Sequence, residues 1–584
     1  MEIDDVIEDG VICVRHDLFN RSNSSDSSTS EVSDAEAEVD YLSQKLCLWN
    51  VQYNITRDAC GSLLHILKPL HPELPLDPRT LNQTPRKAAI QNLRNGSYAH
   101  VGLISGLQKR VESGLNIDGN MRIGIDVNID GINMTKSTIT DVWPILRPFV
   151  VGFFVGTGKP DPLEDYLHSF IEETLQLFND TLTVGESKYE VYIRCFICDA
   201  PARQYIKRIV GHASYNACER YEDVIHQSDP EHHVGVSPLL RLNLKMVSQF
   251  ALDPFHLVLE GVVKRYLMFV LRGTKSGMRL RGESILEISR RLVELRKYIP
   301  MEFARKPVGL EQLGKWKGTQ LRFFLLYGGC VVLKDVVAEI LYKLFIMLQI
   351  AIIIFSVQKL IDDENYFSFA KDLIAQFVIL SSNKDVFGEK FCVYNIHGLL
   401  HLYEDVRKYG EISSISAFPF ESFLGIFKQM LRSPTKPIQQ LFRRLAERNF
   451  LDDFCERIIN FQSHLTPKNP IHGTNNYKIL TSSLFTLSSV HRRDSYFQYK
   501  GSVASVRSIQ KLENGDVVII ANICDTKTNF FDYPCKSSYF GIYNLGCMKW
   551  TQTNVIIPIN AVTTKYVVLP YENDNIAIPL LHSF

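Results

Sequence analysis

The segment Tyr189-Glu-Val-Tyr-Ile-Arg-Cys-Phe-Ile-Cys-Asp199-Ala-Pro-Ala-Arg203 decides the fold class. Residues 189–198 are rich in β-branched and aromatic side chains, which predicts a strand, and the proline after Asp199 precedes a helical pattern. Upstream, Ile123-Gly-Ile-Asp-Val-Asn-Ile-Asp130-Gly repeats the order of alternating strand and aspartate. A carboxylate at a strand end is well placed to hold a divalent metal ion. The two segments predict a mixed α/β core with Asp130 and Asp199 as candidate ligands.

A third candidate acid lies in Ala417-Phe-Pro-Phe-Glu421-Ser-Phe-Leu, where a helix beginning near Pro419 would carry Glu421 in its first turn. Paired metal ions that transfer a phosphoryl group lie about 3.5–4 Å apart and need several carboxylates around them. Each acid also has a structural explanation, because an Asp before Gly favours a turn and a Glu in a first helical turn offsets the helix dipole. Glu260 is the alternative third acid.

The order of these and further motifs resembles the DDE/D transposases of the CACTA (En/Spm-like) kind, and most closely their animal branch. The resemblance covers residues from about 40 to 584. The motifs that carry it are Asn128-Ile-Asp-Gly-Ile-Asn, Trp143-Pro-Ile, Val155-Gly-Thr-Gly-Lys-Pro, Cys198-Asp-Ala-Pro-Ala-Arg, Gly211-His-Ala-Ser-Tyr, Glu231-His-His-Val-Gly-Val-Ser-Pro-Leu, Leu252-Asp-Pro-Phe-His-Leu-Val-Leu-Glu-Gly-Val, Trp316-Lys-Gly-Thr-Gln-Leu-Arg-Phe-Phe-Leu-Leu-Tyr, His397-Gly-Leu-Leu-His401-Leu and Phe418-Pro-Phe-Glu-Ser-Phe-Leu-Gly.

The resemblance implies an RNase H-like α/β core that is interrupted by a large helical insertion. It also implies that Asp130, Asp199 and Glu421 form the catalytic triad and bind Mg²⁺ or Mn²⁺. The expected ancestral reaction is metal-dependent cleavage and strand transfer on DNA, with transposon ends as the partner and the nucleus as the site of action. The resemblance leaves a homo-oligomer open.

The pattern along the chain predicts several regions. Residues 20–40 are rich in Ser, Asp and Glu and poor in large apolar groups, which is typical of disorder. Residues 485–584 are rich in Val, Ile, Tyr and Thr, which predicts a small β-barrel-like domain. The expected organisation is a disordered acidic tail at 1–40, a helical region at 41–115, core residues at 116–235, a helical insertion at 236–390, further core residues at 391–470 and the β domain at 485–584.

The charge distribution supports an alternative to catalysis. The formal net charge is +0, although residues 1–45 hold twelve Asp or Glu against three Lys or Arg, a balance of −9 that leaves +9 on the rest of the chain. A neutral chain is a poor non-specific DNA binder. The N-terminal region also lacks the Cys/His spacing of a zinc finger. The second hypothesis is therefore a domesticated or relic transposase without catalysis, acting as a nucleic-acid or protein interaction module.

A zinc site is the weakest of the metal predictions. Members of the family carry a Cys-x-x-Cys after the Gly-His motif, whereas here Cys218-Glu-Arg-Tyr221 has lost the second cysteine. A structural zinc site needs four ligands. The residues left for a degenerate site are Cys218, His212, His256, His397 and His401, of which the last two would share one helix face. We therefore do not expect a complete zinc site.

Two other classes of protein are excluded by sequence. The segment Gly152-Phe-Phe-Val-Gly-Thr-Gly-Lys159-Pro160 has the wrong glycine spacing for a phosphate loop and a proline where a Ser or Thr would bind magnesium, so no nucleotide cofactor is expected. The apolar run Leu344–Val357 is too short to span a membrane and predicts a buried helix. The N-terminus has no basic region of a secretory signal, so a nuclear or cytoplasmic protein with reduced cysteines is expected.

Four basic clusters could follow a DNA backbone. They comprise residues 275–281, 290–297, 305–306 and 443–444. Charge runs are usually solvated helix faces. The three clusters in the predicted insertion could together line a path for DNA.

Overall fold

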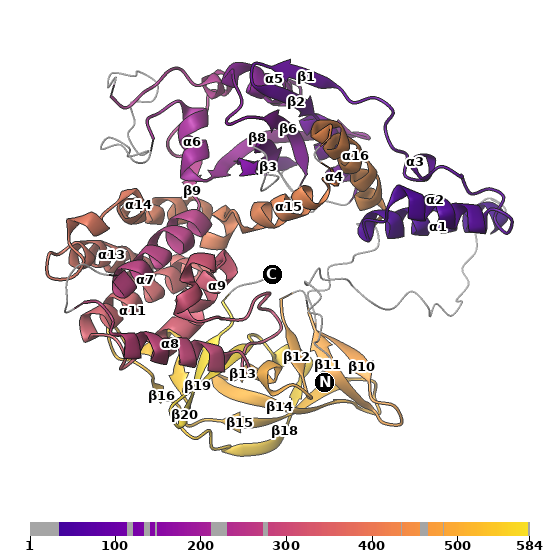
Figure 1. Ribbon diagram of the computed structural model, residues 1–584. Coiled ribbons are helices and arrows are strands. Elements are labelled where there is room, and N and C mark those ends of the chain that lie inside the picture. The colour runs from indigo at the N-terminus through magenta and orange to yellow at the C-terminus, as the bar shows by residue number, and fades with distance from the viewer. Residues whose placement is uncertain are drawn as a thin grey trace. The chain divides into compact units, whose positions relative to one another are not determined.

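The computed structural model describes residues 34–113, 121–133, 141–146, 149–211, 231–272, 278–433, 435–455, 465–482 and 484–581 (Figure 1). Side chains are described in these ranges except at 34–40, 132–133, 141–146 and 449–455. The chain divides into two compact units, Met1–Arg86 with Ala446–Asp452, and Lys87–Leu445 with Asp453–Phe584.

The first unit is helical. It contains α1 (Asp34–Gln52), α2 (Arg57–Leu67) and α3 (Pro78–Leu81). Thr56 caps the start of α2, where its hydroxyl accepts a hydrogen bond from the Ala59 amide at 3.2 Å, because the first amides of a helix have no partner within it. The apolar core of this unit consists of Cys47, Cys60, Leu64, Leu74 and Leu81.

The N-terminal boundary differs from the sequence prediction. Residues 1–40 were expected to be disordered, but α1 begins at Asp34. The segment Asp34-Ala-Glu-Ala-Glu38 explains the difference, because Ala and Glu favour helices and acidic residues in a first turn interact favourably with the helix dipole. Residues 1–33 lie outside the described residues.

A mixed sheet of nine strands forms the core of the second unit. The strand order is β1-β2-β6-β5-β3-β8-β7, with β4 paired to β5 and β9 paired to β8. β3 and β8 are parallel, as are β8 and β9, and the other pairs are antiparallel. The strands are β1 (Ile90–Leu93), β2 (Gly96–His100), β3 (Arg122–Ile129), β4 (Ile132–Asn133), β5 (Asp141–Leu146), β6 (Val150–Gly156), β7 (Leu182–Val184), β8 (Ser187–Cys198) and β9 (Phe250–Leu252).

Helices cover both faces of this sheet. Successive side chains of a strand point to opposite faces. In β8, Phe196 and Cys198 pack in the core that contains α4 (Leu103–Glu112) and α5 (Leu163–Asp180). Cys195 and Ile197 pack in the opposite core, which contains α15 (Phe418–Gln429) and α16 (Pro437–Cys455). Because apolar residues fill both faces, the strand reads as a nearly continuous apolar run in sequence.

The middle of the chain is helical, as the sequence predicts. Residues 236–390 were expected to form an insertion, yet β9 falls in that range and belongs to the core sheet. The remaining elements between β8 and α15 are α6 (Ala200–Lys207), η1 (Pro238–Leu242), the π-helical η2 (Phe255–Val263), α7 (Lys264–Arg272), α8 (Gly282–Leu295), η3 (Leu310–Lys315), α9 (Gly318–Phe323), the π-helical η4 (Phe324–Gly328), α10 (Gly329–Val332), α11 (Glu339–Phe355), α12 (Gln358–Ile361), α13 (Glu364–Ser381), η5 (Glu389–Phe391), α14 (Tyr394–Tyr409) and η6 (Ile412–Ile415).

The apolar run Leu344–Val357 forms most of α11, and nearly all of its side chains are buried in the largest apolar core. Tyr266 and Phe324 pack against Phe345 of this helix. The prediction of a buried helix is confirmed. Within the described ranges, no helix is both long and apolar enough to cross a membrane.

The C-terminal region consists of two antiparallel sheets. One has the order β10-β11-β14-β15-β18, with β12 and β13 at its side, and the other has the order β16-β17-β20-β19. The elements are β10 (Thr466–Pro470), β11 (Asn476–Thr481), β12 (Thr486–Ser488), η7 (Arg492–Asp494), β13 (Tyr496–Tyr499), β14 (Ser502–Lys511), β15 (Val517–Cys524), β16 (Thr528–Asn529), η8 (Ser537–Phe540), β17 (Tyr543–Asn544), β18 (Gln552–Pro558), η9 (Ile559–Ala561), β19 (Tyr566–Tyr571) and β20 (Asp574–Pro579). The sheets begin at Thr466, earlier than the residue 485 expected from sequence.

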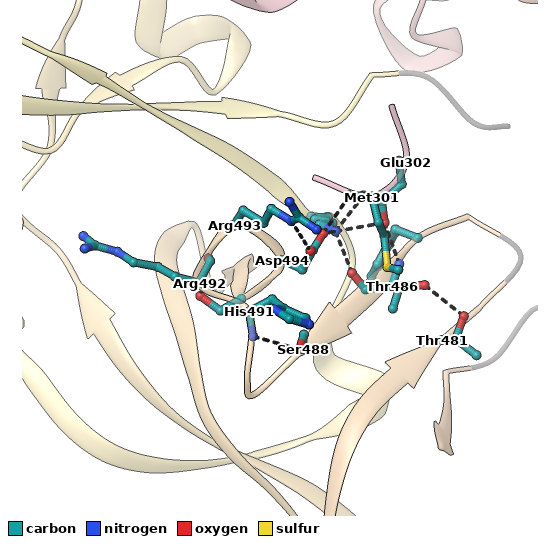
Figure 2. Close-up of polar contacts among 12 residues, drawn as sticks. Met301, Glu302, Thr481, Thr486, Ser488, His491, Arg492, Arg493 and Asp494 are labelled. Carbon is teal, nitrogen blue, oxygen red and sulfur yellow. Dashed lines mark hydrogen bonds and ion pairs between the residues drawn. The ribbon is translucent and has the colours of Figure 1, made fainter. Parts of the chain in front are cut away.

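A buried ion network joins the helical region to the β region (Figure 2). The Lys565 ammonium, 0% exposed, lies 2.7 Å from Oε2 of Glu302 and 2.7 Å from Oδ1 of Asp494, both 1% exposed. Lys565 also donates to the Thr486 carbonyl. Glu302 follows α8, whereas Asp494 and Lys565 belong to the β region. Since buried charges are tolerated only when they are paired and hydrogen-bonded, the network requires the two regions to remain docked.

We expect Lys565→Met to destabilise the protein by about 3–5 kcal/mol, because removing one partner of a buried ion network leaves uncompensated carboxylates. Urea unfolding followed by circular dichroism would show a lower midpoint. Lys511→Met, at the exposed end of β14, is the matched control and should change stability by less than about 0.5 kcal/mol. Adding Glu302→Gln and Asp494→Asn to Lys565→Met should restore part of the loss. Equal midpoints for Lys565→Met and the native protein would contradict this prediction.

Candidate functional site

Asp130 and Asp199 lie side by side at the ends of two parallel strands. β3 ends at Ile129 and β8 at Cys198, so each aspartate is the first residue after its strand. Val127 pairs with Phe196, and the same register continued past the strand ends sets Asp130 beside Asp199. The side-chain Nδ2 of Asn128 donates a hydrogen bond to the backbone carbonyl of Ile197 at 2.6 Å, which holds the two strand ends together. The strands predicted from sequence therefore deliver both acids to one edge of the sheet.

Asp130 has a perturbed environment. Burial raises its pKa well above the ordinary value, and the negative charges of Asp199 and Glu421 raise it further. The charge of His256 and the hydrogen bond from the Gly131 amide act in the opposite direction. Asp130, Asp199 and Glu421, which come from three separate elements, are thus close enough for their charges to interact. Mutual repulsion among buried carboxylates is typical of sites that bind a cation.

Asp199 also has a structural role. One carboxylate oxygen accepts a hydrogen bond from the Ala202 amide at 2.7 Å and caps α6, which has a proline in its first turn. Such capping by Asp is common at helix starts. The cap fixes the orientation of the carboxylate at the sheet edge, so the structural explanation and the functional one apply to the same side chain.

A third aspartate ends the neighbouring strand. Cys198 pairs with Leu252 in the parallel pair of β8 and β9, so the register sets Asp253 beside Asp199. Asp253 is 1% exposed. Its carboxylate accepts hydrogen bonds from the amides of Phe255 at 2.9 Å and Ala417 at 2.8 Å. Asp253 thereby connects the end of β9 to the start of α15.

His256 connects Asp253 to Glu421. Its Nδ1 lies 2.5 Å from Asp253 Oδ2, and its Nε2 lies 3.4 Å from Glu421 Oε1. Burial of the imidazole disfavours its charged form, but the hydrogen bonds to Asp253 and Glu421 outweigh burial and raise the pKa of His256 to about 10. A protonated His256 therefore holds the Glu421 carboxylate at the site.

The structure distinguishes the two candidates for the third acid. Glu421 lies in the first turn of α15, as predicted, and its charge acts on Asp130. Glu260 of η2 instead pairs with Lys264 at 2.6 Å, one turn further along the helix. Glu421 is therefore the acid that the fold brings to the strand ends.

Of the residues proposed for a degenerate zinc site, only His256, His397 and His401 lie among the described residues. His212 and Cys218 lie outside the described residues. His256 is engaged by Asp253 and Glu421, as described above. His397 and His401 share one face of α14, with their Nε2 atoms 3.2 Å apart. Among the side chains that the structure describes, no group of three or more His, Cys, Asp or Glu residues is arranged as a ready metal site.

Lys159 brings a positive charge to the aspartates. It follows β6 in the loop before α5, and its ammonium donates to the Pro201 carbonyl at 3.0 Å. Burial lowers the pKa of Lys159, while the negative charge of Asp199 acts in the opposite direction. The segment that superficially resembles a phosphate loop is therefore a strand and a connecting loop beside Asp199.

Two arginines of the predicted basic cluster at residues 290–297 are paired with glutamates. Arg290 pairs with Glu287 and Glu294 along α8. Arg291 pairs with the same Glu287 and donates to the Lys334 carbonyl. Guanidinium groups with carboxylate partners of this kind contribute little to a DNA-binding surface.

Sequence comparison concerns a different part of the chain. A family model described as a domain of unknown function (DUF8592) matches residues 463–580. The match covers the C-terminal β region from β10 to β20. Comparison with curated proteins gives no match. These findings delimit the β region, and the matched range does not include Asp130, Asp199 or Glu421.

Asp253 is the site residue that the sequence analysis missed. The motif Leu252-Asp-Pro-Phe-His256 was considered only for its histidine. Its aspartate follows apolar residues and precedes a proline, as Asp199 does in Cys198-Asp-Ala-Pro201. This similarity could have predicted that Asp253, like Asp199, follows the end of a strand. β9 is only three residues long, too short for a periodic pattern to reveal it.

We expect Asp253→Asn to destabilise the protein by about 3 kcal/mol, because an amide would place its NH₂ group against donors that now bond a carboxylate. Thermal unfolding would show the loss. Asp180→Asn, at the exposed end of α5, is the control and should alter stability by less than about 0.5 kcal/mol. Equal stability of the two variants would show that Asp253 does not organise the site.

Proposed function

We propose that this chain derives from a CACTA-type DDE/D transposase. Its ancestral reaction would be metal-dependent DNA cleavage and strand transfer in the nucleus, with transposon ends as the DNA partner. The observation that carries the proposal is the electrostatic coupling of Asp130 to Asp199 and Glu421 at one edge of the core sheet. Asp199 also caps α6, but this cap does not require the other two acids beside it, and the convergence of three carboxylates suits a site for cations.

The strand order supports an RNase H-like core. β3, β5 and β6 form an antiparallel meander, and β8 and β9 extend the sheet beside β3 in parallel. This arrangement is compatible with the RNase H-like core that the resemblance implies. Asp130 follows β3, Asp199 follows the parallel strand β8, and Glu421 lies in α15, which packs on the sheet. This placement agrees with the arrangement implied by the resemblance.

The donor set fits magnesium or manganese better than zinc. Asp130, Asp199 and Glu421 offer carboxylate oxygens, which Mg²⁺ and Mn²⁺ prefer. The pKa of Asp130 is raised first by burial and then by repulsion from the other two acids, and a cation would relieve both effects. When bound, these ions would activate an attacking hydroxyl and stabilise the leaving oxygen. The protein itself orients the acids. The α6 cap holds Asp199, and Asp253 with His256 holds Glu421.

A non-catalytic interaction module is the second candidate. The net charge is +0, and Arg290 and Arg291 are paired with glutamates. Neither feature favours a protein that must bind the phosphate backbone of DNA. Under this alternative the fold persists as a docking scaffold for a nucleic acid or a protein, and no cleavage accompanies binding.

A nicking and strand-transfer assay with Mn²⁺, on DNA from the flanks of the gene, decides between the two. We expect Asp199→Asn to lower cleavage by at least about a thousandfold, since metal ions supply several kcal/mol of transition-state stabilisation. Asn caps helices about as well as Asp, so α6 should remain intact. Glu421→Gln should have a similar effect, whereas Glu260→Gln should not. Cleavage by Asp199→Asn at the native rate would refute the catalytic proposal, and no cleavage by the native protein would favour the interaction module.

Metal binding gives a readout that does not need activity. Asp130→Asn should raise the melting temperature in metal-free buffer, because it removes a carboxylate that burial and like charges destabilise. Added Mn²⁺ should stabilise the native protein and have less effect on Asp130→Asn. Equal Mn²⁺ responses of the two proteins would argue against Asp130 as a ligand.

A further inference from the structure

Arg322 is a half-buried cation with no carboxylate partner in the described part of the chain. It lies in α9, with its guanidinium carbon 4.5 Å from the ring centroid of Phe418. Among the described residues, none forms an ion pair or a hydrogen bond with this guanidinium. Burial lowers its pKa, with the charge of Tyr327 acting in the opposite direction. An arginine nevertheless stays protonated at neutral pH, so Arg322 brings an uncompensated positive charge.

Aromatic contacts connect Arg322 to the candidate site. Phe418 and Glu421 are three residues apart in α15, a spacing that places them on one face of the helix. The ring centroids of Phe418 and Phe255 lie 4.7 Å apart, and so do those of Phe255 and His256. A chain of rings therefore runs from Arg322 to the histidine that holds Glu421.

Close packing fixes α9 in this position. A Cβ atom at Gly318, the first residue of α9, would lie 2.2 Å from the Phe255 ring, so a glycine is needed where α9 meets η2. Gln320 further anchors the helix by donating to the Lys306 carbonyl at 3.1 Å. Arg322 is therefore carried by a fixed helix and not by a loose surface segment.

A second polar group accompanies Arg322. The Thr319 hydroxyl is buried, and none of the residues that the structure describes forms a hydrogen bond with it. Thr319 and Arg322 are three residues apart in the same helix and so lie on neighbouring positions of its surface. Buried polar groups without a partner are uncommon and call for a physical explanation. A hydroxyl and a guanidinium together form a donor pair suited to an anion.

Three other buried or half-buried cations among the described residues have oxygen partners. Arg194 pairs with Asp126 at 2.5 Å, and Lys565 pairs with two carboxylates. Arg203 donates to the Cys198 carbonyl and to the Tyr394 hydroxyl. Arg322 has only the face of an aromatic ring, which compensates less for the lost hydration than an anion would. The difference suggests that its partner is a ligand.

We propose that Arg322 and Thr319 bind a phosphate group of a nucleic-acid backbone and position it beside Asp130, Asp199 and Glu421. The proposal rests on the function proposed above and adds the residues that hold the substrate. A guanidinium matches the geometry of a phosphate with two parallel hydrogen bonds, which a lysine cannot form. Phosphate contacts of this kind set the register of a nucleic acid without reading its sequence. Arg322 is in this role a positioning residue.

The test measures binding of a short fluorescent DNA duplex by anisotropy across a salt series, with Ca²⁺ in place of Mg²⁺ to keep the strands intact. Arg322→Gln should weaken binding by about tenfold or more, because a charge-assisted contact is lost. The slope of log K against log salt should fall by about 0.9, the value for one phosphate contact. Arg322→Lys should keep the slope and lose affinity. Arg290→Gln is the matched control, since glutamates already neutralise Arg290, and it should leave both quantities unchanged.

Inorganic phosphate provides a second measurement. At constant ionic strength it should raise the melting temperature of the native protein and of Arg290→Gln, but not of Arg322→Gln. Native affinity and salt slope in Arg322→Gln would overturn the proposal. Should that variant fail to fold, Thr319→Val, which is nearly isosteric, should weaken DNA binding by about fivefold, and native affinity in it would overturn the proposal as well.

The two proposals can fail separately. Loss of cleavage in Asp199→Asn with DNA affinity retained would support the catalytic assignment whatever Arg322 does. A native protein that binds DNA through Arg322 without cutting it would uphold the phosphate site and reject catalysis. Unchanged DNA binding in Arg322→Gln, together with cleavage that depends on Asp199, would reject only the phosphate site.

Discussion

Asp253 is the buried carboxylate on which the geometry of the candidate site depends. It accepts hydrogen bonds from the amides of Phe255, His256 and Ala417 and from the imidazole of His256. A buried carboxylate is costly unless its oxygens are satisfied, so the end of β9 and the start of α15 must stay together. The same contacts orient His256 toward Glu421. One charge thus connects two segments that are distant in sequence and places the third acid.

Buried charges that have opposite-charge partners occupy structural positions in this protein, whereas buried charges without such compensation lie at the candidate functional positions. The network of Lys565, Glu302 and Asp494 is internally balanced and holds the β region to the helices. Asp130 and Arg322 are not balanced, since one faces like charges and the other has no anion. Proteins accept such local conflicts mainly where a ligand resolves them. The conflicts have opposite signs and both lie near α15, Arg322 through Phe418 and Asp130 through Glu421, which suits a phosphodiester accompanied by metal ions.

Two π-helical segments border the site. η2 begins with Phe255 and His256, and η4 follows directly after α9, the helix of Arg322. π-helical turns are rare and occur frequently at functional sites. α9, which carries Arg322, also packs tightly on the start of η2 at Gly318. The irregular helices therefore lie where the uncompensated charges are, whereas α11, the most apolar helix, lies in the core and carries no candidate residue.

Much of the core could be predicted from sequence because its signals are local. The alternating residues before Asp130, the apolar run before Asp199 and the Pro-initiated helix of Glu421 each lie within a few residues of the acid they present. The tertiary structure decided what depends on distant partners. It placed β9 in the sheet with Asp253 directly after it, and it set Glu421 rather than Glu260 at the strand ends. It also paired Arg290 with glutamates, whereas Arg322 has no such partner among the described residues. Parallel register and charge compensation join residues far apart in the chain, and no local pattern in the sequence records them.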